Sequence, residues 1–259
     1  MVLRIASLAE CPEMYGRVTA MADTWPEFLR NDLVGNAHYG RIARELPEYV
    51  LFAEDESGEV VAHAYSVPFA LGSGSGSGSG GGGEGEGLGA LPARGWDEVV
   101  VWAFGDLRHG TTPDTVSAIS VVVAPHAQGT GLSARMLSAM RDNARAKGFG
   151  QVVAPVRPSA KHLEPRSAME EYAFRTRDDG LPHDPWLRVH VRAGARIEAV
   201  APASMTVAAS LDEWRGWTGL PFDKEGQIEV PGALVPVHCE PARGYAVYVE
   251  PNVWVRHAL

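Results

Sequence analysis

The sequence predicts an α/β (α+β) fold built around a central mixed sheet. Apolar runs that are typical of strands alternate with segments of helical periodicity along the 259 residues. With 45% hydrophobic and 21% charged residues, the chain can bury a sizeable core and does not have a disordered composition. One tract, residues 72–87, consists only of Gly, Ser and Glu, and it predicts a flexible coil because it has no apolar area to bury.

The first part of the chain is expected to begin with a strand at residues 3–7. Two segments of mostly helical composition follow, at 11–30 and 38–46. Two apolar runs then flank a short polar turn that contains glycine, which is the pattern of a β-hairpin. The strands of this hairpin are expected at Tyr49–Asp55 and Val60–Phe69.

Four elements in the middle of the chain have clear physical signals. A helix is expected at Trp96–Leu107, because two acidic residues in its first turn suit the positive end of the helix dipole. The β-branched run Val116–Val123 predicts a strand. Apolar residues at helical spacing predict a helix at Leu132–Lys147, which a glycine ends. Gln151–Val156 is expected to be the next strand.

The last hundred residues are less regular. A polar, proline-rich stretch at 157–184 predicts an insertion with a short helix near Ser167–Phe174. A helix is expected at Trp186–Ala193, and strand-like pieces lie within Arg196–Ala208. The late elements are expected to be a short helix at Leu211–Trp217 and strands at Tyr245–Val249 and Val253–Val255.

Charge and cysteine content narrow the function classes. The 32 acidic and 23 basic residues give a formal net charge of −9, and no basic block is present to neutralise phosphates, so nucleic-acid binding is not expected. No apolar stretch approaches the roughly 18–20 residues that cross a bilayer, and no secretory signal is recognisable. We therefore expect no membrane partner and a cytoplasmic location. Cys11 and Cys239 cannot form a disulfide framework or a four-cysteine zinc site, so no metal is expected.

The most informative segment is Val121–Ser133, where a strand runs into a glycine turn that opens a helix. Backbone N–H groups converge in such a turn and the helix dipole adds positive potential, so the segment predicts a phosphate or pyrophosphate cradle. Gly129 and Gly131 lack a Cβ, which lets the backbone approach a ligand closely. A leucine after Gly131 excludes a Walker A loop. The glycines also satisfy a dinucleotide pattern, but strand 151–156 lacks the carboxylate of a Rossmann unit.

This segment resembles motif A of the GNAT (Gcn5-related) N-acetyltransferases, Q/R-x-x-G-x-G/A. Gln128, Gly131 and Ser133 stand at its three key positions, with serine in place of the usual glycine or alanine. The resemblance implies a mixed, mostly antiparallel sheet with a splayed parallel strand pair and helices on both faces. It covers most of residues 1–210, and residues 211–259 are expected to be a C-terminal extension that packs on the same domain.

In this family the pyrophosphate of acyl-CoA lies on such a loop, and the pantetheine lies between the two splayed strands. The resemblance therefore implies acetyl-CoA, or another acyl-CoA, as co-substrate. A backbone N–H of Val121 is the candidate donor to the oxyanion of the tetrahedral intermediate. The residues expected to bind acyl-CoA are Val121, Val122, Val123, Gln128, Gly129, Thr130, Gly131, Leu132 and Ser133.

A second, partial resemblance concerns a later helix. GNAT enzymes often end their last core helix as A-x-x-L-Y-x-K-x-G-F, with the tyrosine near the sulfur of CoA. Val189–Ala195 aligns with the end of this motif by its glycine, so that His190 takes the place of the tyrosine and Ala195 that of the aromatic residue. Because imidazole titrates near neutrality, His190 is the candidate general acid for the departing thiolate. A structural or ligand-contacting histidine is the alternative.

The resemblance implies direct acyl transfer from a CoA thioester to the primary amine of a small molecule. Two other classes stay open: a non-catalytic acyl-CoA-binding module, and a CoA-thioester enzyme of different outcome, such as a hydrolase or an acyltransferase to another nucleophile. An exposed sheet edge near the C-terminus would allow a homodimer. Variable loops build the acceptor site on this fold, so the acceptor and the general base do not follow from the sequence.

Other polar and aromatic residues have a plainer interpretation beside a functional one. His126 is expected to neighbour the phosphate loop, and Asp97 and Glu98 to be carboxylates at a helix start. Cys239, beside His238, is expected to be a buried strand cysteine. In the insertion, His162, His183 and Asp184 either are solvated or cover the acceptor site. Arg157, Lys161 and Arg166 are expected to form a basic cluster, which either is a solvated face or meets an acidic substrate or the 3′-phosphate of CoA. Three tryptophans near the C-terminus are expected to be packing residues: Trp214, Trp217 and Trp254.

Overall fold

The computed structural model describes residues 3–22, 24–72 and 89–259. Apart from Gly72, the glycine-rich tract at 72–87 lies outside the described residues. The strands are β1 (Arg4–Ser7), β2 (Val50–Glu54), β3 (Val60–Phe69), β4 (Thr115–Val123), β5 (Gln151–Val156), β6 (Arg196–Ser210), β7 (Gly226–Ile228), β8 (Val237–Glu240) and β9 (Tyr245–Ala258). The helices are α1 (Tyr15–Thr19), α2 (Leu33–Glu45), α3 (Gly95–His109), α4 (Leu132–Ala146), α5 (Met169–Ala173), α6 (Pro185–Arg192) and α7 (Leu211–Thr218).

The described strands form one sheet in the order β1-β2-β3-β4-β5-β9-β8-β7, and β6 pairs with β9. The pairing is antiparallel throughout except between β4 and β5. These two parallel strands pair only where they begin, at Val116–Val152 and Ser117–Val153. The predicted mixed, mostly antiparallel sheet with a splayed parallel pair is therefore confirmed.

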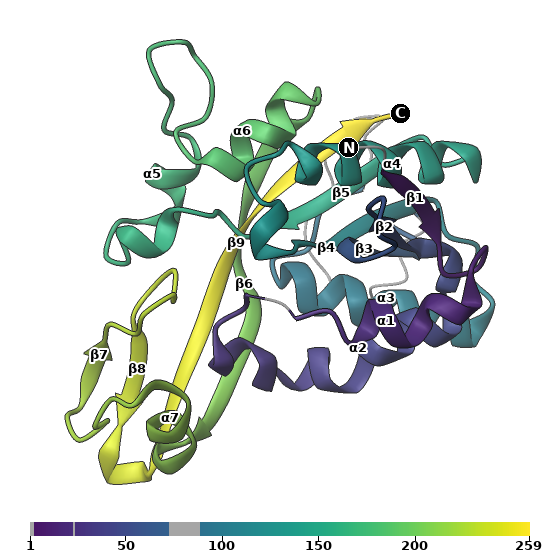
Figure 1. Ribbon diagram of the computed structural model, residues 1–259. Helices are drawn as coiled ribbons and strands as arrows, with labels where there is room; N and C mark the ends of the chain where they lie inside the picture. The colour runs from purple at the N-terminus through teal and green to yellow at the C-terminus, as the bar shows by residue number, and fades with distance from the viewer. Residues whose placement is uncertain (1–2, 23, 73–88) are drawn as a thin grey trace.

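Helices cover both faces of this sheet, as predicted (Figure 1). Helix α4 packs on β2 to β5, whereas α3 contacts β3 and β6 and carries α2 on its outer side. In Figure 1, α4 lies above the strands and α1 to α3 lie below them. None of the helices in the described ranges is both long and apolar enough to cross a membrane. The apolar face predicted for α4 is buried as a unit: Leu132, Met136, Leu137, Met140 and Ala144.

The structure corrects three predicted elements. The segment 11–30, expected to be mostly helical, forms only short helical pieces in its described residues, two of which are 3-10 turns that begin at Pro12 and directly after Pro26. The strand-like pieces at 196–208 form a single strand, β6. The two late strands are also one strand, β9, because the register with β6 shifts opposite Pro251 and so accommodates a residue without an N–H.

Strand β9 joins two parts of the sheet. Its residues 253–258 pair with β5, and its residues 245–247 pair with β8 at the far end. Figure 1 shows β9 as a long diagonal strand that links the main body to an outer lobe of α7, β7 and β8. The domain boundary expected after residue 210 falls at the end of β6, and the sheet continues across it.

Candidate functional site

A glycine loop joins β4 to α4. After a 3-10 turn at Pro125–Ala127, the chain passes through two residues of positive φ, Gly129 at +75° and Gly131 at +81°. A Cβ built on either glycine would meet no atom within 4 Å. Glycine is therefore favoured by the left-handed backbone rather than by crowding, and the space in front of the loop is open.

Helix α4 begins directly after this loop without a side-chain cap. Gly131 is its N-cap residue, and none of the side chains that the structure describes caps the N–H groups of the first turn. The side chains of the loop brace its own backbone: Thr130 Oγ1 donates to the carbonyl of Ala127 at 2.7 Å, and Gln128 Nε2 donates to that of Val123 at 3.2 Å. An uncapped helix start next to an open loop is a site for an anion such as a phosphate.

A pocket of about 580 Å³ extends from the loop through the gap between β4 and β5. Its volume is that of a small-molecule or cofactor site. Most of the expected acyl-CoA-binding residues line it, whereas Thr130 and Gly131 lie on the loop outside its wall. The lining residues from the loop and the two strands include Val121, Val122, Val123, Gln128, Gly129, Leu132, Ser133, Ala154, Pro155 and Val156.

A β-bulge shapes the strand beside this pocket. The register between β3 and β4 shifts so that Tyr65 faces Ser120 and Ser66 faces Ala118, which leaves Ile119 as the extra residue. The carbonyl of Ile119 accepts from Trp96 Nε1 at 3.0 Å. The bulge therefore anchors a tryptophan of α3 against the pocket wall, a contact between segments far apart in the sequence.

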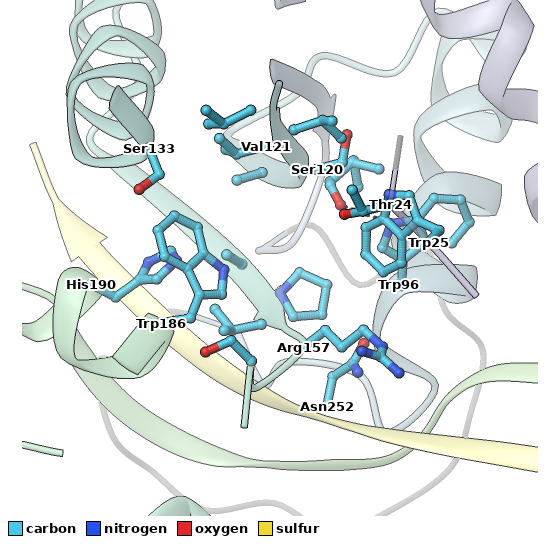
Figure 2. A pocket seen from close by; sticks show the side chains of 18 of the residues that line it. Thr24, Trp25, Trp96, Ser120, Val121, Ser133, Arg157, Trp186, His190 and Asn252 are labelled. Atoms are coloured by element: carbon cyan, nitrogen blue, oxygen red, sulfur yellow. Dashed lines mark hydrogen bonds between the residues drawn. The ribbon is translucent and has the colours of Figure 1, made fainter. Parts of the chain in front are cut away.

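His190 enters the pocket from α6, on the side of Ser133 and Trp186 (Figure 2). The helix is held by Asp184, whose side chain caps it by accepting from the N–H groups of Trp186 and Leu187. The same carboxylate accepts from Ala160 N–H at 2.9 Å and from Tyr172 Oη–H at 3.0 Å. Asp184 is thus a buried structural residue that ties the insertion to the helix carrying His190.

Burial lowers the pKa of His190 below its ordinary value. Its side chain is 2% exposed, and burial together with the neighbouring His257 lowers its pKa to about 3. At neutral pH the imidazole is therefore neutral. It can give a proton to a thiolate only after it has taken one from another group, and the general-acid role of His190 stays a prediction with this added condition.

The other end of the pocket is polar and aromatic. Figure 2 shows Trp25, Trp96, Arg157 and Asn252 there, opposite His190. Arg157 Nε donates to both oxygens of Glu250, at 2.9 and 3.1 Å, and Glu250 is completely buried. The network continues through Asn252 to Ser204 Oγ, which lies 2.6 Å from Asn252 Oδ1.

Sequence reasoning missed most of these residues, because no local motif joins them. One signal was present: Glu250 and Asn252 interrupt an otherwise apolar strand at alternate positions and so share one face of it. Polar residues on a buried strand face require partners, and here Arg157, which directly follows β5, and Ser204 of β6 supply them.

Two more carboxyls are buried nearby. Asp97, in the first turn of α3, is 2% exposed, and burial raises its pKa to about 8, with the charge of Asp32 acting in the same direction. Burial also raises the pKa of Asp32, which caps α2 by accepting from Gly35 N–H. Asp97 therefore lies at a helix start as expected, but it is not solvated.

The expected basic cluster of the insertion is dispersed. Arg157 lines the pocket, whereas the Lys161 ammonium is buried and donates to the carbonyls of Glu164 and Leu234. Arg166 is exposed and pairs with Glu229. His162 lines the pocket, His183 is exposed, and His126 lies on the surface near Glu59.

The C-terminal candidates are packing residues, as predicted. Cys239 is fully buried in β8, and burial raises the pKa of its thiol. Trp214 and Trp254 are also buried, with Trp214 packed against Phe28 and Phe222. Within the described ranges, no group of three His, Cys, Asp or Glu side chains has an arrangement that would hold a metal ion.

Comparison with known proteins places these features in context. No protein-family model matches the chain. The chain is 29% identical to the arginine N-acetyltransferase avaD of Aspergillus versicolor, over 98% of this chain and 93% of the relative. The loading GNATL domain of CurA from Lyngbya majuscula has a similar structure, with 19% identity, a TM-score of 0.59, and 99% and 96% of the two chains covered. The GphF GNAT-like decarboxylase in complex with isobutyryl-CoA follows at 17% identity, a TM-score of 0.56, and 100% and 99% coverage.

The two structures show that the fold is that of the GNAT proteins. The splayed strands, the glycine loop and the uncapped helix α4 supply the features that the motif resemblance implied. The chain is also similar over nearly its full length to an N-acetyltransferase, and this agrees with the resemblance of its glycine loop to motif A.

Proposed function

We propose that the protein is an N-acyltransferase that moves an acyl group, acetyl by default, from CoA to a primary amine of a small molecule. The observation that carries the proposal is the pocket itself, which opens at the glycine loop and continues between β4 and β5 to a polar end. A donor can lie along the strands while an acceptor enters from the other side. The named relative is an N-acetyltransferase, which supports the same chemistry.

The donor half of the mechanism uses the loop and the strands. The N–H groups of Gln128 to Ser133 and the start of α4 would hold the pyrophosphate. The backbone of Val121 to Val123 would hold the pantetheine and place the thioester carbonyl beside a backbone donor, which stabilises the oxyanion as the amine attacks. No metal is needed in this scheme, because backbone dipoles supply the positive potential.

The acceptor half uses the polar end. Trp25 and Trp96 offer apolar faces there, and the guanidinium of Arg157 offers hydrogen-bond donors. Since the named relative is an arginine N-acetyltransferase, arginine and other amino acids head the list of acceptors to test. We further propose that the protein acts in the cytoplasm. We also propose that it forms a homodimer, which gel filtration would test.

A thiol-release assay with acetyl-CoA and a panel of amines tests the proposal. We expect free CoA to appear only when an acceptor is present, with one molecule of N-acetylated product for each CoA released. Thiol release without an acceptor would indicate a hydrolase. Micromolar CoA binding without any thiol release would indicate a binding module. Each of these two results contradicts the proposed activity, and mass spectrometry of the products distinguishes them.

A further inference from the structure

We propose that His257 is a positioning residue for catalysis, which holds the neutral imidazole of His190 so that its Nε2 presents a lone pair to the pocket. The proposal deepens the proposed function and rests on it, since it assigns a proton carrier to the acyl transfer. It is drawn from a pair of buried histidines on two elements, β9 and α6, that lie 67 residues apart in the sequence.

The two rings make a direct hydrogen bond. Nδ1 of His190 and Nε2 of His257 lie 3.0 Å apart, and both residues are buried, at 2% and 0% exposure. Trp186 packs against the His190 ring with an edge contact, at 4.6 Å between centroids. Because Nδ1 of His190 is used by His257, the nitrogen left for the pocket is Nε2.

The surroundings of His257 decide which ring carries the shared proton. Arg141 from α4 and the backbone carbonyl of Ala193 act on this ring, the guanidinium lowering its pKa and the carbonyl raising it. The carbonyl of Ala193, which also accepts from Arg141 at 2.9 Å, favours a proton on the His257 ring, and Nδ1 is the ring nitrogen that the bond to His190 leaves to carry it. With Nδ1 of His257 protonated, its Nε2 accepts from Nδ1–H of His190, and Nε2 of His190 keeps a lone pair.

The charged groups around the pair keep it neutral. The guanidinium of Arg141 and the second imidazole oppose a positive charge, and no carboxylate acts on either ring in the described residues. Burial lowers the pKa of His257 to about 4, next to the value of about 3 for His190. A neutral imidazole with a fixed lone pair suits proton acceptance rather than initial donation.

One nitrogen, Nε2 of His190, can then both accept and return the proton of the acyl transfer. As the amine nitrogen bonds to the thioester carbon, Nε2 of His190 accepts the proton that the nitrogen loses. When the C–S bond breaks, the thiolate of CoA takes this proton from the same Nε2. His190 returns to its neutral form, and His257 keeps the ring in the same orientation and tautomer through both steps.

The test compares two substitutions of His257. His257→Leu removes the acceptor for His190 Nδ1–H, and we expect kcat to fall about tenfold or more, within the range of general acid–base contributions. The KM for acetyl-CoA and the Kd for CoA should stay within about twofold, because the loop and strands are untouched. His257→Gln keeps an amide oxygen near the position of Nε2 and should restore most of kcat. If the leucine variant does not fold, His257→Met serves in its place.

A second readout is independent of turnover. The ¹⁵N chemical shifts of the imidazoles distinguish a protonated nitrogen from one with a lone pair. In the unaltered protein Nε2 of His190 should have the lone-pair shift, and in His257→Leu this preference should be lost. A protonated Nε2 in the unaltered protein would overturn the proposal, and so would an unchanged kcat in His257→Leu. If no amine is acetylated at all, the proposed function fails, while the chemical shifts still decide whether His257 sets the tautomer.

Discussion

The two ends of the pocket are built in different ways. The donor end comes from one continuous stretch of the chain, in which β4, the glycine loop and the start of α4 follow each other. The acceptor end is assembled from distant segments, with Trp25, Trp96, Arg157 and Asn252 brought together by the sheet. Backbone conformation defines the first end, whereas a buried side-chain network defines the second.

This difference predicts how a substitution at each end of the pocket affects the protein. A local site depends on a few φ angles and on exposed N–H groups, so a change there should alter ligand affinity and leave the fold in place. A dispersed site depends on buried partners, so a change there should first cost stability. The four predictions below test this contrast, from the largest expected effect to the smallest.

The largest effect is expected at Glu250. Its carboxylate is fully buried and pairs with Arg157, which is only 16% exposed. In Glu250→Leu the guanidinium would be left buried without its partner, so we expect a loss of about 3–5 kcal/mol in the free energy of unfolding. Urea denaturation measures it. The control is Glu229→Leu at the exposed pair with Arg166, where the loss should be at most about 1 kcal/mol. Equal losses of stability in the two variants would contradict the expected difference between the buried and the exposed ion pair.

The next effect concerns pH and Asp97. Its pKa is about 8 in the folded protein and 3.8 in an unperturbed chain. Between these values the folded state keeps a proton that the unfolded state has lost. The contribution of the protonated Asp97 to the free energy of unfolding is therefore fully present below pH 3.8 and is lost as the pH rises toward 8. The slope should be at most about 1.4 kcal/mol per pH unit.

The variant Asp97→Asn cannot titrate at this position, so it should have a flatter stability profile between pH 5 and 8. Thermal unfolding of both proteins across this range is the measurement. Glu98→Gln changes the net charge of the same helix start and is the matched control. A profile of Asp97→Asn that is as steep as that of the unaltered protein would show that Asp97 does not cause the decline.

Asp184 should link stability to turnover. In Asp184→Ala, helix α6 loses its cap, and we expect a loss of about 2 kcal/mol in stability together with a lower kcat, since α6 carries His190. Ser210→Ala removes the cap of α7 in the outer lobe and should cost about 1 kcal/mol without changing kcat. Denaturation and thiol release measure the two effects. A kcat that falls equally in both variants would argue against a role for α6 in the site.

The smallest effect is expected at the loop glycines. Gly131→Ala and Gly148→Ala act at opposite ends of α4, at similar φ angles of +81° and +87°, and a new Cβ would meet no atom at either position. Both should lose about 1–2 kcal/mol in stability from the strained backbone. Only Gly131→Ala should also weaken CoA binding, by about tenfold, which corresponds to 1.4 kcal/mol. Calorimetry with CoA is the measurement, and matching affinities would place the pyrophosphate elsewhere.

The same contrast explains what could be predicted from the sequence. The hairpin, β4, α4 and β5 follow from hydrophobic periodicity and turn residues, which act over a few positions. The glycine loop follows because positive φ angles select glycine locally. The ion pair of Arg157 with Glu250 and the pair of His190 with His257 span 93 and 67 residues, and no periodicity reports a contact over that separation. The sequence predicts two strands where the structure has only β9, because a proline indicates a strand end unless the partner strand is known to shift register there.

The position of β9 also has a consequence for how the protein reaches its fold during synthesis. The parallel strands β4 and β5 and the glycine loop emerge from the ribosome almost a hundred residues before the strand that covers the free edge of β5. Until then β5 presents an unpaired, largely apolar edge, which is a known starting point for aggregation. Final closure requires contacts of high sequence separation, which are slow to form. The nascent chain is therefore expected to be most dependent on chaperones in the interval between the synthesis of β5 and that of β9.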